Sequence, residues 1–153
     1  MSDVRSKKLV QIVQEVQVVQ KFKMATVRDF EDLAIFQKAR ELSKKIYDIT
    51  EKEKFKRDFR FVAQIHASVG SIMDNIAEGF ERNGNKEFVN FLFIAKGSCG
   101  EVRSQLIRAN DVGYLEPEEY KELYTECRRL SAGIMNFIKE IKASDMAGSK
   151  YNS

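Results

Sequence analysis

The sequence predicts an all-helical chain (all-α) that folds as an antiparallel, up-down-up-down four-helix bundle. Four segments repeat apolar residues at alternating steps of three and four, the spacing that places side chains on one face of a helix. The chain of 153 residues has a single proline, Pro117, and a proline inside a helix costs about 3 kcal/mol. The connections between the four segments are short, so consecutive helices are expected to run in opposite directions.

The first two predicted helices cover residues 30–52 and 57–81. Asp29 is the expected N-cap of the first, because its carboxylate can accept a backbone N–H. The apolar stripe of the first helix consists of Ile35, Ala39, Leu42, Ile46 and Ile49. The stripe of the second consists of Phe59, Val62, His66, Val69, Met73 and Ile76.

The third and fourth predicted helices cover residues 86–112 and 117–142. The stripe of the third consists of Leu92, Ala95, Cys99, Val102, Leu106 and Ala109. The stripe of the fourth consists of Tyr120, Leu123, Cys127, Leu130, Ile134, Phe137 and Ile141. Gly113 is expected to close the third helix and Pro117 to begin the fourth, the positions that these residue types favour.

The two ends of the chain differ from the predicted bundle, which spans residues 24–145. Residues 1–23 contain the Val/Gln-rich stretch LVQIVQEVQVVQKFK. This leader is interpreted as a flexible or non-native extension upstream of a start at Met24; the alternative is an added helix or strand that docks on a partner. Residues 146–153 are expected to form a disordered tail.

Composition and charge indicate a globular, cytoplasmic protein without a membrane span. Apolar residues make up 43% and charged residues 32% of the chain, and no apolar run approaches the roughly 20 residues of a membrane-spanning helix. Residues 1–23 carry five basic and two acidic side chains, so the leader accounts for the whole net charge of +3. Residues 24–153 are neutral overall, so they lack the excess of positive charge that is typical of a strong nucleic-acid-binding surface.

The sequence lacks the residue constellations of common catalytic sites, so we expect no enzyme activity, no metal and no cofactor. The single histidine, His66, falls on a predicted apolar stripe and is interpreted as structural. Cys99 and Cys127 have no metal-spaced partner and are expected to be reduced core residues. A structural polar cluster that fixes helix register or caps a loop is predicted from Asn75, Glu78, Ser98 and Glu101.

Residues 88–95, FVNFLFIA, predict contact with another subunit, because only Asn90 is not apolar and the segment exceeds two helical turns. The predicted interface consists of Phe91, Phe93 and Ile94, with a second small stripe of Ile65 and Ile72. Exposed apolar surface of this extent is typical of interfaces. The alternative is that helix 86–112 is the central helix, wrapped by the other three.

The middle of the sequence resembles a known bacterial family of four-helix bundles. Residues 64–102 read QIHASVGSIMDNIAEGFERNGNKEFVNFLFIAKGSCGEV, and the blocks NIAEG and KEFxxFLxIAxGS within them are characteristic. The family is that of the 23S rRNA intervening-sequence proteins, related to the accessory variability proteins of retroelements. The resemblance extends over about residues 29–141 and leaves out the leader.

This resemblance implies a homo-oligomeric ring, commonly a homopentamer, associated with ribosomal RNA loci. Its retroelement relatives bind nucleic acid and protein. The sequence departs from the family where two basic residues are usual, since His66 and Ala67 stand there. Met73 and Asp74 likewise replace a proline and a serine. The loss of basic residues weakens an RNA-binding role for helix 57–81, because cations hold phosphates.

Two functions follow from these observations: a ring-forming, RNA-binding protein that engages structured RNA or a ribonucleoprotein, and a protein-only scaffold or adaptor with no nucleic-acid binding. The candidate nucleic-acid contacts are Lys38, Lys44, Lys45, Lys52, Lys54, Lys56, Arg57 and Arg60. A basic segment, residues 52–60 with a net charge of +3, and an acidic segment, residues 111–122 with a net charge of −4, are expected at the same end of the bundle. The basic and acidic segments either pair within a subunit, pair across a ring interface, or remain solvated.

Overall fold

The described part of the chain is all-helical, as the sequence predicts. The computed structural model describes residues 2–25, 27–82 and 84–149, and these contain α-helices and one 3₁₀ turn but no strand. The elements are α1 (Ser2–Ala25), η1 (Phe30–Asp32), α2 (Ala34–Thr50), α3 (Glu53–Lys56), α4 (Phe59–Glu81), α5 (Asn85–Asp111) and α6 (Pro117–Ser149). No described helix is long and apolar enough to cross a membrane.

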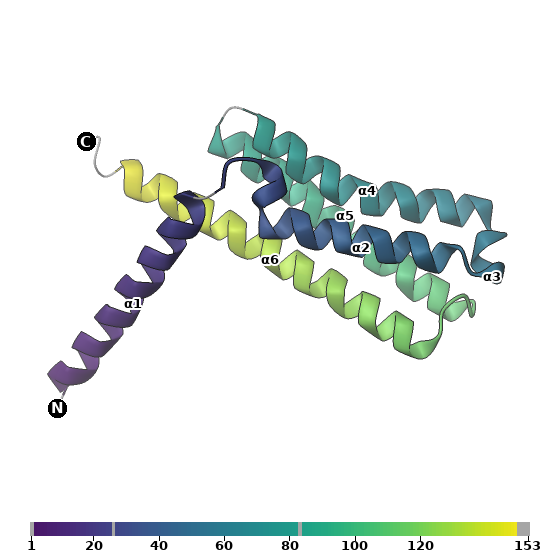
Figure 1. Cartoon of the computed structure of the whole chain (residues 1–153), viewed down its shortest axis with the longest axis horizontal. Helices are drawn as coiled ribbons and strands as arrows, with labels where there is room; N and C mark the ends of the chain where they lie inside the picture. Colours follow the sequence, from purple (N-terminus) through teal and green to yellow (C-terminus); the bar gives the residue numbers. More distant parts are fainter. Residues whose placement is uncertain (1, 26, 83, 150–153) are drawn as a thin grey trace.

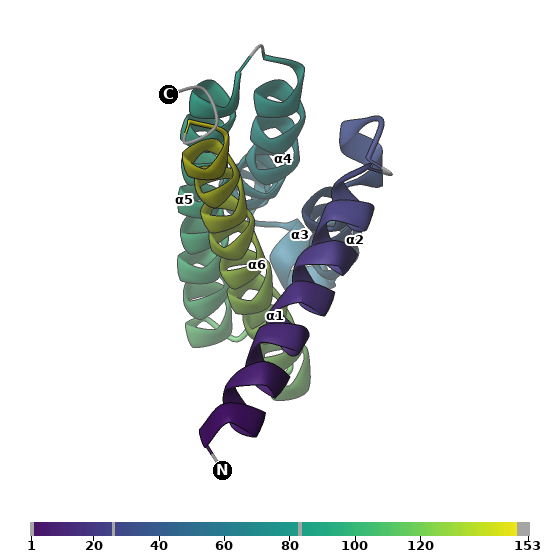
Figure 2. The same ribbon diagram turned by 90° about the vertical axis from the view of Figure 1, so that its left-hand side faces the viewer.

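The long helices α2, α4, α5 and α6 lie side by side and share one apolar core (Figure 1, Figure 2). Hydrogen bonds join α4 to α5 at two levels: Ser68 meets Gln105, and Ser71 meets Ser98. The residue number on α5 falls as the residue number on α4 rises, so these two helices run in opposite directions. The edge between α2 and α6 is bridged by ion pairs from Lys45.

Local sequence signals set the helix ends. Asp29 and Asp32 form a capping box around η1, so α2 begins at Ala34, four residues later than predicted. Asp58 caps α4 by accepting a hydrogen bond from the Phe61 N–H at 3.2 Å. Gly113 has φ 76°, the left-handed conformation that favours glycine after a helix C-terminus.

The apolar stripes predicted for α2 and α5 are buried throughout, but the stripe predicted for α4 is buried only in part, with Val69 and Ile76 in the core. Phe59, assigned to the core, is 81% exposed, and Phe61 is buried instead. Ile65 and Ile72 were expected in an exposed stripe for a neighbouring subunit, and both are fully buried within this one. The reason is that α4 carries apolar residues on adjacent faces, and the face with Ile65 and Ile72 turns inward. This corrects their assignment to the oligomer interface.

The first helix, α1, projects away from the other helices (Figure 1). Side chains 3–15 are exposed, including the large apolar Leu9 and Ile12. The interpretation of residues 1–23 as a flexible or non-native leader stays a prediction. At the other end α6 continues to Ser149, so it includes residues 146–149 of the predicted tail. Residues 150–153 lie outside the described part.

Candidate nucleic-acid interface

The eight predicted nucleic-acid contacts fall into two groups according to their ion pairs. Five pair with carboxylates of the same chain: Lys44, Lys45, Lys52, Lys56 and Arg57. The other three, Lys38, Lys54 and Arg60, form no ion pair with another described residue and remain available for phosphates. The cations that the sequence groups together are therefore unequal as candidates.

Two of the paired lysines, one in α2 and one at the start of α3, contact the first three turns of α6. Lys45 Nζ lies 2.8 Å from a Glu122 carboxylate oxygen and also contacts Glu126. Lys52 pairs with Glu119 in the first turn of α6. Hydrogen bonds to Glu122 and Glu126 raise the pKa of Lys45 above its usual value. The hydrogen bond from Lys52 lowers the pKa of Glu119. For Lys52 and Glu119, the pairing between the basic and acidic segments is thus within one subunit.

An exposed aromatic ring accompanies the unpaired cations where α3 meets α4. Phe59 is the first residue of α4 and is 81% exposed, and Arg60 is its neighbour in the chain. Lys54 lies on the preceding short helix α3. We call Lys54, Phe59 and Arg60 the α3–α4 corner. An exposed aromatic ring and unpaired cations close to it in the chain are the groups that can stack a nucleobase and hold its phosphate.

Sequence reasoning missed Phe59 because its position fits the apolar stripe of helix 57–81. The signal that argues against the core lies in the neighbours: Phe59 stands between Asp58 and Arg60, directly after the N-cap. Phe61, two residues later, packs on Phe55 with ring centroids 5.0 Å apart and fills the core position. Phe59 is therefore free to face solvent.

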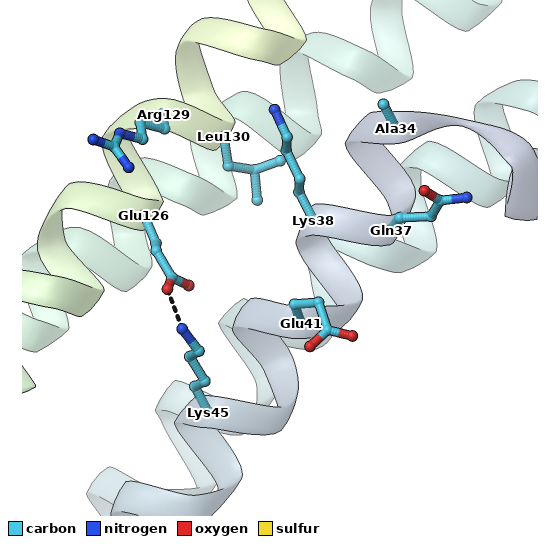
Figure 3. Close-up of a pocket in the computed structure, with 8 residues that line it drawn as sticks. All are labelled: Ala34, Gln37, Lys38, Glu41, Lys45, Glu126, Arg129 and Leu130. Carbon is cyan, nitrogen blue, oxygen red and sulfur yellow. Dashed lines mark hydrogen bonds and ion pairs between the residues drawn. The ribbon is translucent and has the colours of Figure 1, made fainter.

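Lys38 lies in a groove of about 520 Å³ between α2 and α6. Figure 3 shows Lys38 and Lys45 extending from α2 toward α6, with the Lys45–Glu126 pair at one end. Arg129 also lines this groove but points away from α2 (Figure 3). Of the two lining cations that form no ion pair within the described ranges, Lys38 therefore extends into the groove, while both lining carboxylates, Glu41 and Glu126, pair with lysines.

The predicted subunit interface on α5 is partly exposed. Phe93 and Ile94 are 42% and 52% exposed, respectively, and Phe91 is half-buried. One cation flanks this surface, since Lys142 Nζ lies 5.3 Å from the centre of the Phe93 ring. We call Phe93 and Ile94 the α5 apolar surface. Because both stay exposed, α5 is not simply wrapped by the other helices.

The predicted polar cluster comes together only in part. Asn75 donates to the Ser71 hydroxyl at 3.0 Å, and that hydroxyl meets the Ser98 hydroxyl at 2.9 Å. Glu78 instead pairs with Arg82, one turn further along the chain. Glu101 forms no hydrogen bond to the other three predicted members, although it lines a groove between α4 and α5 together with Ser71. The side-chain hydrogen bonds that join this cluster are therefore made by serine hydroxyl and side-chain amide groups.

The single histidine and the two cysteines have shifted pKa values. Burial lowers the pKa of His66, whose ring stacks on Tyr47 at 3.8 Å. His66 Nε2 lies 2.8 Å from Thr50 Oγ1, which donates its own proton to the Tyr47 carbonyl. Burial raises the pKa of Cys99 and of Cys127 to about 12, so both thiols stay protonated at neutral pH. Among the residues that the structure describes, no group of three or more His, Cys, Asp or Glu is placed to hold a metal ion.

Comparisons with known proteins point to one family. The family model described as 23S rRNA-intervening sequence protein matches residues 31–136. A crystal structure from Bacteroides thetaiotaomicron, described as a protein with unknown function from the S23 ribosomal protein family, has a TM-score of 0.64 to this chain at 24% identity. The match covers 69% of this chain and 99% of that one and shows a shared fold. No curated protein matches the sequence.

Proposed function

The chain belongs to the family of 23S rRNA-intervening sequence proteins, and on that premise we propose that it is a non-enzymatic, homo-oligomeric binding protein that engages structured RNA or a ribonucleoprotein in the cytoplasm. Membership rests on the family model, whose match to residues 31–136 covers more than half of the chain. The proposed assembly is a ring, a pentamer, whose subunits are up-down-up-down four-helix bundles of α2, α4, α5 and α6.

The α3–α4 corner is the observation that carries the RNA-binding proposal. Lys54 and Arg60 have no carboxylate partner among the described residues, so phosphates do not have to displace one. Phe59 adds an exposed ring on which an unpaired base can stack. RNA loops and bulges present such bases, and they are the parts of structured RNA that proteins read.

Removing both cations of the corner is expected to weaken RNA binding. The double variant Lys54→Ala, Arg60→Ala should bind a defined hairpin RNA about tenfold more weakly, and its dependence of log Kd on log salt should fall by roughly 1–2. Fluorescence anisotropy across a salt series measures both quantities. The matched control, Lys86→Ala with Lys139→Ala, removes the same charge from exposed positions on α5 and α6. Equal weakening in both doubles, or no binding by the native chain, would contradict the proposal.

The α5 apolar surface supports the homo-oligomer. Exposed apolar side chains gain about 25 cal/mol per Å² when an interface removes them from water, and Phe93 and Ile94 offer such area within the apolar segment 88–95. A ring requires a head-to-tail contact, in which this surface meets a different patch of the next subunit.

A charge placed on this surface is expected to dissociate the assembly. Phe93→Glu should raise the dissociation constant of the subunit contact by roughly 30-fold or more, the effect typical of a central interface position. Multi-angle light scattering over a dilution series measures the mass, and circular dichroism checks that the variant remains helical. Leu9→Glu on α1 is the control and should leave the mass unchanged. A native chain that is monomeric at every concentration would remove the support for a ring.

The second candidate function is a protein-only scaffold or adaptor. The observation in its favour is that five of the eight candidate cations already pair within the subunit, including Lys45 and Lys52. Such pairs reduce the positive field that attracts nucleic acid. A partner captured from nuclease-treated lysate at high salt, with no binding to hairpin RNA, would favour this function over the first.

A further inference from the structure

A second groove, about 470 Å³ in volume, runs between α4 and α5. We call it the α4–α5 groove. It shares no lining residue with the groove that holds Lys38 and includes no residue of the α3–α4 corner. Its α5 side consists of Glu101, Ser104, Gln105 and Arg108. These residues follow one face of the helix over two turns, so their polar groups line the same wall of the groove.

Gln105 lines this groove and carries a buried acceptor without a donor. Its side chain is 93% buried, since only 7% is exposed, and its Oε1 has no hydrogen-bond partner in the described structure. The amide orientation is fixed, because the Ser68 hydroxyl donates its one proton to the Gln64 carbonyl at 3.0 Å. Ser68 Oγ must therefore accept from Gln105 Nε2, 2.9 Å away. A buried carbonyl without a donor is unfavourable and calls for a partner.

Glu101 adds a second unpaired acceptor one turn away. It precedes Gln105 by four residues, so the Cβ atoms of the two are about 5–6 Å apart on one helix face. No hydrogen bond or ion pair joins Glu101 to another residue in the described ranges. Two residues that line the groove therefore carry acceptors without a donor: the exposed Glu101 carboxylate and the buried Gln105 amide oxygen.

Arg108, the cation of the groove, is engaged elsewhere. Its guanidinium carbon lies 4.3 Å from the centre of the Phe61 ring, and its NH2 donates to Gln64 Oε1 at 3.1 Å. The stacking and the hydrogen bond hold the guanidinium toward α4, so it leaves Glu101 without a counter-charge. An anionic ligand at the acceptor pair would be repelled by Glu101 and would supply no donor to Gln105.

We propose that the α4–α5 groove binds a guanidinium or primary ammonium group, which bridges the Glu101 carboxylate and Gln105 Oε1. Such a group carries positive charge and several N–H donors, so it satisfies both acceptors at once. The same chemistry is offered by a free guanidino compound or amine and by an arginine or lysine side chain of a partner protein. The inference does not depend on RNA binding, which we assign to the α3–α4 corner.

Isothermal titration calorimetry with two probes tests the proposal on the full chain. Agmatine represents a free guanidino compound, and the peptide acetyl-Gly-Arg-Gly-amide represents a basic side chain. Tighter binding of agmatine assigns the site to a free ligand, and tighter binding of the peptide assigns it to a partner protein. The citrulline version of the peptide, which replaces guanidinium with neutral urea, should bind at least about tenfold more weakly because it lacks the charge.

Two variants separate this site from general surface charge. Glu101→Gln is expected to weaken binding about tenfold and Gln105→Met about fivefold, since each removes one acceptor. Glu140→Gln removes an equivalent exposed carboxylate on α6 and should leave the affinity unchanged.

The proposal is overturned by any of three results: no heat of binding for either probe at millimolar concentration, equal affinity for the citrulline peptide, or full affinity in Gln105→Met. Glu101 lies on the exposed side of α5, so Glu101→Gln keeps the fold and serves as the test even where Gln105→Met disturbs the Ser68 contact.

Discussion

Ile72→Ala is expected to lower the free energy of unfolding by about 2–5 kcal/mol, the range for truncating a buried isoleucine. Ile72 is 0% exposed and lies in the core shared by the four long helices. The substitution removes methyl and methylene groups from contact and leaves a cavity that tightly packed neighbours cannot fill. Urea denaturation followed by circular dichroism measures the change.

Ile94→Ala is the matched control, because it makes the same chemical change at a position that is 52% exposed. Measured at a concentration where the chain is dissociated, it should change the free energy of unfolding by no more than about 0.5 kcal/mol. If Ile72→Ala lowers the free energy of unfolding by as little as Ile94→Ala, then α4 turns a different face to the core from the one described above.

Gly79→Ala is expected to destabilise the fold by about 1–3 kcal/mol, the usual cost of overpacking. A Cβ at Gly79 would lie 2.6 Å from Phe91 Cβ and 2.9 Å from Phe88 Cδ2. Phe91 Cβ is attached directly to the backbone of α5, so the clash can be relieved only by moving the two helices apart. Thermal and urea unfolding both report the loss.

Gly70→Ala, on the same helix, provides the opposite expectation. No atom lies within 4 Å of a Cβ built at Gly70, so the substitution gains helix propensity without a clash and should stabilise by about 0.5–1 kcal/mol. The difference in sign between the two glycines is the test. If Gly79→Ala also stabilises the fold, the close approach of α4 and α5 at this point is wrong.

The helices were predictable from the sequence where one apolar face dominates. In α2 the stripe from Ile35 to Ile49 has polar residues on the other faces, so only one orientation buries it. In α4 the residues Val62, Ile65, Val69 and Ile72 occupy adjacent faces, and a spacing count cannot decide which face turns inward. Contacts with α5, such as Ser68 with Gln105, distinguish the two orientations, and they exist only after folding.

The candidate sites were less predictable, because a sequence shows which charges exist but not how they pair. Lys45 and Glu122 are 77 residues apart in the chain and 2.8 Å apart in space. That pairing removes Lys45 from the free cations, and nothing in the local sequence distinguishes it from Lys38. Nothing in the sequence marks Gln105 as a site residue. Its oxygen lacks a partner because Ser68 donates its only hydroxyl proton to the Gln64 carbonyl.

The two buried thiols can report how often the packing of α5 and α6 opens to solvent. Cys99 on α5 and Cys127 on α6 are buried and protonated, and alkylating reagents attack only an accessible thiolate. Modification of either one therefore requires α5 and α6 to separate first. The rate of labelling under native conditions then equals the frequency of that separation when the reagent is fast, and reflects its equilibrium population when the reagent is slow.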